Sequence, residues 1–180
     1  MKIAYKHLIK NIKENPSIEE LSDSLFQLGH EHEIENRIFD IEFTPNRGDC
    51  LSVNGLIRDL AVFYTIDSHQ EIYTKEINEL SINFKNLSEK ICPQITFLKL
   101  EIDKIPQDYN QLLNSYFVDL NIGKNNFFTD ISNYLSYETG QPTHCYDADR
   151  MDGRLEFHEI NNKEEFESLL DKKITLTGKN

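Results

Sequence analysis

Apolar residues recur at helical spacing over residues 17–28, the most regular segment of the sequence. Ser17 is followed three residues later by Glu20, which is the capping-box pattern of a helix start. Gly29 stands where such a helix would end, because glycine adopts the left-handed conformation of a helix C-terminus without cost. The apolar positions that share one face are Ile18, Leu21, Leu25 and Leu28. The pattern therefore predicts a helix over residues 17–28.

Residues 37–44 alternate between apolar and acidic positions, which is typical of a half-buried strand. Phe39, Ile41 and Phe43 would share one face of this strand, opposite Asp40 and Glu42. The sequence P-N-R-G-D-C at 45–50 indicates a turn, and apolar residues at helical spacing predict a second helix over 52–64. Together these segments predict a small helix-strand-helix domain.

Residues 67–90 are polar and poorly patterned, so they are interpreted as a linker with one short strand at 80–84. Beyond the linker, the patterns predict strands at 95–102, 155–160 and 174–177, and helices at 108–120, 131–137 and 164–170. The predicted fold class is α+β, with an N-terminal domain at 1–66, a linker at 67–90 and a second α+β domain at 91–180.

Composition narrows the class of protein. The 180 residues carry a formal charge of −12, whereas a protein that binds nucleic acid through its net field is expected to be basic. The lysines of the first 15 residues could contact phosphate, but a solvated helix face explains them more simply. No apolar run reaches the roughly 18 residues that a membrane span requires. Three cysteines without a C-x-x-C pair indicate free thiols and a cytoplasmic protein.

Most motifs of catalysis are absent, including G-x-G-x-x-G, the P-loop, H-E-x-x-H and G-x-S-x-G. His30 and His32 in H-E-H-E would give a metal ion two ligands with no clear third, so a solvated loop is favoured and no metal site is predicted. His144 beside Cys145 suggests a thiol nucleophile, but adjacent residues rarely orient toward each other as nucleophile and base.

The segment from Asp130 to Asp147 concentrates small polar residues around a Gly-Gln-Pro turn. Hydroxyl, amide and imidazole groups come from Ser132, Asn133, Gln141 and His144. Such a set suits a pocket for a small ligand with a polar head. It equally suits a loop that satisfies its own backbone, and the residues alone leave both alternatives open.

Two long segments carry a resemblance to a known family. Residues 39–61, F-D-I-E-F-T-P-N-R-G-D-C-L-S-V-N-G-L-I-R-D-L-A, and residues 125–153, with D-I-S-N-Y and G-Q-P-T-H-C-Y-D, are similar to segments of the β subunit of bacterial phenylalanyl-tRNA synthetase. The order of the two segments is also that of the family. The resemblance spans most of the chain.

The resemblance implies that the second domain is an editing module, which hydrolyses tyrosine wrongly esterified to phenylalanine tRNA. It implies that Ser132, Asn133, Pro142 and His144 line the editing pocket, with His144 near the ester as a tentative catalytic residue. In the family the α subunit carries the aminoacylation site and uses ATP and Mg²⁺, so no cofactor is expected on this chain. The implied partners are the α subunit and the 3′ aminoacyl end of tRNA(Phe), with no membrane.

The departures from the family carry expectations of their own. About ten residues, 29–38, stand where the family inserts an OB-fold tRNA-binding domain. The sequence also ends before the Glu that recognises the tyrosine hydroxyl in the family, so the chain is interpreted as an N-terminal portion that edits poorly by itself. Two other functions stay open, namely a non-catalytic assembly module with a degenerate editing fold and a free-standing hydrolase acting in trans.

Overall fold

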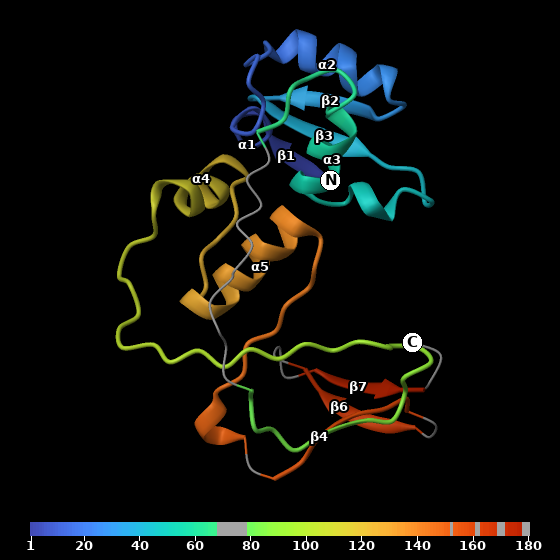
Figure 1. Ribbon diagram of the computed structural model, residues 1–180, viewed down its shortest axis with the longest axis vertical. Coiled ribbons are helices and arrows are strands. Elements are labelled where there is room, and N and C mark those ends of the chain that lie inside the picture. The colour runs from blue at the N-terminus through green and yellow to red at the C-terminus, as the bar shows by residue number, and fades with distance from the viewer. Residues whose placement is uncertain (68–78, 152, 161–162, 169–171, 178–180) are drawn as a thin grey trace. The chain divides into compact units, whose positions relative to one another are not determined.

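The computed structural model describes residues 1–67, 79–151, 153–160, 163–168 and 172–177 (Figure 1). The chain forms two compact units, one from 1–67 with 102–145 and one from 79–101 with 146–177. Helices and small sheets occur together, which confirms the α+β class. The boundaries at 66 and 90 drawn from the sequence stay a prediction. Among the described residues, no helix is both long and apolar enough to cross a bilayer.

The first unit contains a three-stranded antiparallel sheet in the order β1-β3-β2, formed by β1 (Lys2–Ala4), β2 (Glu31–Glu35) and β3 (Ile38–Glu42). Asn36 and Arg37 connect β2 to β3, and both have positive φ, as a two-residue type I′ hairpin requires. Three helices accompany this sheet, namely α1 (Tyr5–Ile9), α2 (Ile18–Gln27) and α3 (Val53–Leu60). Phe39 and Ile41 of the central strand β3 are fully buried among apolar residues of these three helices. The predicted alternation of β3 is thus confirmed.

Capping fixes both ends of α2 as the sequence predicts. The Ser17 hydroxyl accepts from the Glu20 amide at 3.2 Å, and the Glu20 carboxylate accepts from the Ser17 amide at 2.8 Å. At the other end Gly29 has φ +81, and the amides of Gly29 and His30 donate to the carbonyls of Phe26 and Leu25. These two bonds form a Schellman motif, which ends the helix and turns the chain inward at His30.

The same unit continues with α4 (Gln111–Asp119) and α5 (Phe127–Thr139). Leu113, Tyr116 and Phe117 of α4 are buried against aromatic residues of α5, including Tyr134 and Tyr137. The predicted helix at 108–120 is confirmed with a later start, because the Asn110 side chain caps the Leu113 amide at 2.9 Å. The predicted helix at 131–137 is confirmed and is longer than expected.

The second unit is built from two pairs of short strands. β4 (Phe84–Asn86) pairs in parallel with β5 (Leu155–Phe157), and β6 (Glu164–Glu167) pairs antiparallel with β7 (Lys173–Leu176). The Ser88 hydroxyl supports the first pair by accepting from the Glu159 amide at 2.9 Å. The remaining short elements are the 3₁₀ turns η1 (Gly48–Cys50) in the first unit and η2 (Ala148–Arg150) in the second.

Several predicted elements were wrong or displaced. The segment 164–170 was predicted to be a helix, but its described part begins with β6, and 169–170 lie outside the described residues. The strand predicted at 95–102 does not form, and the strand predicted at 80–84 lies later, as β4. The second helix ends at Leu60 rather than at 64. The N-terminal domain contains β1, α1 and β2 in addition to the predicted helix-strand-helix. Residues 68–78 of the predicted linker lie outside the described residues.

Candidate functional site

α5 positions the residues that the sequence analysis selected. The Asn126 side chain starts the helix by accepting from the Thr129 amide at 3.1 Å. Gly140, with φ +75, ends it, and the Gly140 amide donates to the Ser136 carbonyl at 2.9 Å. A left-handed residue at this position reverses the chain direction. The segment 141–145 therefore returns along the helix that it has just left.

Three residues of α5, spaced four apart on one face, bind this returning segment. The Ser132 hydroxyl donates to the Thr143 carbonyl at 2.5 Å and lies 2.9 Å from the Thr143 hydroxyl. The Ser136 hydroxyl donates to the Gln141 carbonyl at 3.3 Å. The Cys145 thiol lies 3.9 Å from the Phe128 carbonyl. The spacing places Thr143, and with it the adjacent His144, beside the helical turn that carries Ser132.

The structure thus brings Ser132 next to the segment of His144, while Asn133, Pro142 and His144 itself are exposed. The Ser132 hydroxyl donates to the backbone of the loop that follows its own helix. This contact agrees with the alternative of a loop that satisfies its own backbone. Two hollows of about 310 Å³ and 420 Å³ are lined by other residues of the first unit. The roles of Ser132, Asn133, Pro142 and His144 in substrate binding stay predictions.

Asp130 anchors α5 to the segment before α4. Its side chain is fully buried and accepts from the Tyr109 hydroxyl at 2.6 Å and from the Asn125 amide at 2.9 Å. Burial, together with the hydrogen bond to this carboxylate, raises the pKa of Tyr109 to about 12. The phenol therefore stays protonated and continues to donate at neutral pH, which ties the segment before α4 to the first turn of α5.

His7 of α1 joins the N-terminal sheet region to both of these helices, and nothing in the sequence around it indicates that role. Its ring nitrogens lie 2.9 Å from the Tyr137 hydroxyl and 2.9 Å from the Ser115 hydroxyl, and the residue is 2% exposed. Because the Ser115 hydroxyl donates to the Leu112 carbonyl, it accepts from His7 Nε2, and Tyr137 donates to Nδ1. Burial lowers the pKa of His7 to about 4, so the ring is neutral in the folded protein.

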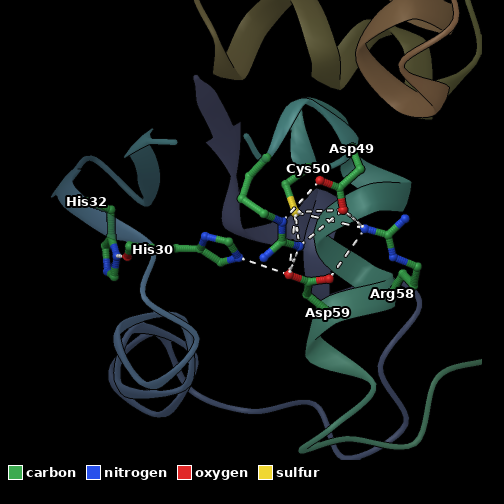
Figure 2. Close-up of polar contacts among 7 residues, drawn as sticks. His30, His32, Asp49, Cys50, Arg58 and Asp59 are labelled. Atoms are coloured by element: carbon green, nitrogen blue, oxygen red, sulfur yellow. Dashed lines mark hydrogen bonds and ion pairs between the residues drawn. The ribbon is translucent and has the colours of Figure 1, made fainter. Parts of the chain in front are cut away.

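A second cluster of polar side chains joins the turn at 45–50 to α3 and to His30 (Figure 2). His30 Nε2 lies 3.2 Å from a carboxylate oxygen of Asp59, and the Cys50 thiol lies 3.4 Å from the same oxygen. His30 and Cys50 are buried, at 3% and 0% exposed. Burial, followed by the contact with Asp59, raises the pKa of the Cys50 thiol to about 11. Cys50 is therefore a protonated thiol at neutral pH.

Two arginines complete this cluster. Arg47 contacts Cys50 Sγ at 2.7 Å and Asp59 Oδ2 at 2.5 Å, and its Nε donates to Asp49 at 3.0 Å. Arg58 also donates to Asp49. The hydrogen bond from Arg47 is the main cause that holds the pKa of Asp49 well below its usual range. The two arginines and two aspartates thus form one alternating ionic network.

Sequence reasoning interpreted H-E-H-E as a solvated loop, and that interpretation was wrong. His30 is buried in the cluster, and the following residues form β2. Figure 2 shows that His32 lies apart from the cluster, where its ring contacts the His30 carbonyl at 2.9 Å. A signal was present, because E-H-E-I-E over 31–35 alternates as a strand does.

Comparison with known proteins adds family relationships to this geometry. Residues 95–180 match the model of the B3/4 domain. The chain is 30% identical over 180 residues to the phenylalanine–tRNA ligase β subunit of Ehrlichia ruminantium strain Welgevonden, a match that covers 96% of this chain and 22% of that protein. It is 28% identical to the corresponding subunit of Psychrobacter arcticus over 153 residues, covering 81% of this chain and 19% of that subunit. The chain spans about a fifth of the length of these relatives.

Proposed function

Because the chain belongs to the family of phenylalanine–tRNA ligase β subunits, we propose that it serves as part of that ligase in the charging of tRNA(Phe) with phenylalanine. The observation that carries this proposal is the match to one such subunit along 96% of the chain. The B3/4 match over 95–180 supports it independently of the N-terminal motif. The partner in this proposal is the ligase α subunit, and the setting is the cytoplasm.

In the proposed assembly the α subunit provides the aminoacylation site. By the family resemblance, ATP and Mg²⁺ are assigned to the α subunit and not to residues of this chain. In aminoacylation, this chain then contributes to the assembly of the ligase and not to the chemical step. Any chemistry of its own belongs to the second proposed activity, which is editing.

Phenylalanine and tyrosine differ by one hydroxyl, and an apolar pocket rejects an added hydroxyl only weakly. A ligase for phenylalanine therefore gains accuracy from a second, hydrolytic site. We assign the 132–144 region to that site, since Ser132 of α5 is hydrogen-bonded to Thr143, the residue before His144. The exposed imidazole of His144 would position or activate the water that attacks the ester.

One observation favours a different function, a module that keeps the editing fold only for assembly. The Ser132 hydroxyl donates to the Thr143 carbonyl, so it already has an acceptor within its own loop. A hydroxyl used in this way stabilises the loop whether or not substrate binds. Under this alternative the region supports contact with the α subunit and performs no hydrolysis.

Assembly is tested by co-expressing the chain with the phenylalanine–tRNA ligase α subunit of the same organism and purifying through a tag on the α subunit. We expect the two chains to co-purify and to elute together in size-exclusion chromatography. Separate elution at micromolar concentration would contradict the proposed place in the ligase.

Editing is tested by following deacylation of Tyr-tRNA(Phe) with the chain alone and with the assembled complex. His144→Ala is compared with His158→Ala, which removes an exposed histidine elsewhere in the chain. Loss of general acid–base chemistry should slow the complex about 100-fold for His144→Ala and leave His158→Ala unchanged. Equal rates for both variants would instead support the assembly module. Fast, His144-dependent deacylation by the chain alone would identify a hydrolase acting in trans.

A further inference from the structure

Three donor atoms of different chemistry converge where the turn at 45–50 meets α3, within the first unit. They are the imidazole Nε2 of His30, the thiol of Cys50 and the carboxylate of Asp59, and all lie within 4.8 Å of one another. Figure 2 shows His30 and Asp59 pointing toward each other, with Cys50 above them. The first two residues are buried and the third is 14% exposed at its side chain. The three donor atoms are therefore largely shielded from solvent.

Secondary structure fixes each donor independently. The Schellman motif after α2 turns His30 inward, η1 carries Cys50, and the last turn of α3 carries Asp59. The ring of His30 also packs edge-on against Phe43, with ring centroids 5.2 Å apart. Preorganised donors lose little conformational entropy when they bind a ligand, so the arrangement favours binding.

Two of the three donor spacings suit a tetrahedral zinc site, and the whole set lies within 4.8 Å. Zinc bonds of roughly 2.0–2.3 Å to N, O and S place neighbouring ligand atoms about 3.3–3.7 Å apart. The imidazole-to-carboxylate distance is 3.2 Å and the thiol-to-carboxylate distance is 3.4 Å. Nitrogen, sulfur and oxygen are also the donor types that Zn²⁺ takes in proteins, and a water molecule can complete the fourth position.

Arg47 occupies the position that a cation would take among these donors. Its Nη2 lies 2.7 Å from Cys50 Sγ and 2.5 Å from Asp59 Oδ2, so a positive charge already sits among the donors. The Arg47 side chain is 30% exposed and is also bound to Asp49 through Nε at 3.0 Å. Its Nη2 also donates to Asp49 Oδ2 at 3.2 Å, so entry of a metal ion requires Nη2 to leave all three of these partners while Nε keeps its bond to Asp49 Oδ1.

We propose that His30, Cys50 and Asp59 form a zinc site in which the metal ion replaces the guanidinium of Arg47. The exchange balances charge and atoms. The Cys50 S–H bond breaks, its proton passes to solvent, a Zn–S bond forms, and one divalent ion takes the place of one guanidinium and one proton. No step changes an oxidation state. This site is independent of the proposed role in the ligase.

The test is titration of the metal-free full chain with Zn²⁺ against a competing chelator, with Co²⁺ as a spectroscopic probe. We expect tetrahedral cobalt bands together with a thiolate-to-cobalt charge-transfer band. Cys50→Ser should remove the charge-transfer band and weaken zinc at least about tenfold, and His30→Ala should weaken zinc similarly. His32→Ala and Cys92→Ser are the matched controls, because neither residue belongs to the cluster, and both should retain wild-type affinity.

Arg47→Ala separates metal binding from damage to the fold. Removing the competing guanidinium should raise zinc affinity by about tenfold or more, in a protein whose far-UV circular dichroism and urea midpoint show that it remains folded. Arg58→Ala is the graded comparison, because that guanidinium lies 3.4 Å from the other oxygen of Asp59 and 4.0 Å from Cys50 Sγ, and it should raise affinity less than Arg47→Ala does. Binding that survives Cys50→Ser, or no binding even in Arg47→Ala, would overturn the proposal.

Discussion

Gly55 in α3 offers the sharpest test of how the P-N-R-G-D-C turn is packed. Replacing glycine by alanine inside a helix usually stabilises a protein by about 1 kcal/mol, through the greater helix propensity of alanine. At Gly55 an added Cβ would lie 2.1 Å from the Asp49 carbonyl oxygen and 3.0 Å from Cys50 Cα. Both neighbours are backbone atoms, so a side-chain rotation cannot relieve the contact.

The magnitude follows from these two opposing effects. To reach an ordinary contact distance, η1 and α3 must separate by about 1 Å in a close-packed region. η1 is held by the Cys50 and Leu51 amides, which donate to Arg47 and Gly48 at 3.0 Å and 3.2 Å. Overpacking of this kind costs about 1–3 kcal/mol, and more where backbone must move. We therefore expect Gly55→Ala to lower the free energy of unfolding by about 2 kcal/mol despite its propensity gain.

Urea denaturation followed by far-UV circular dichroism measures this change, since the chain has no tryptophan. A loss of about 2 kcal/mol lowers the urea midpoint by about 1 M. Gly48→Ala is the matched control, because nothing lies within 4 Å of its added Cβ, and it should stay within about 0.5 kcal/mol of wild type. Hydrogen exchange should place the loss in α3 and η1. A Gly55→Ala protein as stable as wild type would refute the close approach.

Three further predictions concern the first unit. Gly140→Ala should cost about 1–2 kcal/mol, since Gly140 has φ +75 and its added Cβ would lie 3.3 Å from the Ser52 Cβ, and urea midpoints measure the loss. Ser17→Ala should cost about 1 kcal/mol in thermal unfolding through loss of the helix cap, whereas Ser17→Asn should restore it. For His7, the folded pKa of about 4 lies below the ordinary 6.5, so the unfolded chain binds more protons between these values. Stability should therefore be complete above pH 6.5 and fall by up to about 3 kcal/mol toward pH 4, and urea midpoints across this range should show a shallower slope for His7→Gln.

Elements whose stabilising contacts are local could be predicted from the sequence. The start and end of α2 follow from Ser17, Glu20 and Gly29, and all their bonds lie within four or five residues. The strand β3 follows from an alternation that matches its buried face. The helix α5 was predicted, but its length was underestimated. Its N-cap Asn126 precedes a Phe-Phe pair that shows no helical period, so the start of the helix was placed too late.

Elements that depend on a distant partner could not be predicted. The sequence E-E-F-E at 164–167 favours a helix by propensity, yet it pairs with Lys173–Leu176 as β6, with Phe166 opposite Ile174. Residues 95–102 have a strand-like composition but form no strand in the described structure. A strand needs a neighbour to accept its backbone hydrogen bonds, and the local sequence does not specify that neighbour.

The same distinction applies to the two candidate sites. Ser132 and Thr143 meet because a helix and its left-handed cap fold the chain back within a dozen residues, so sequence reasoning could bring that region together. The cluster at His30 requires Cys50 and Asp59 to approach from two other elements, 20 and 29 residues further along. Its only local sign is the Schellman glycine, Gly29, which directs the following side chain toward the helix it has left. In this chain the histidine directly after that glycine is only 3% exposed, so the polar sequence H-E-H-E conceals a buried residue.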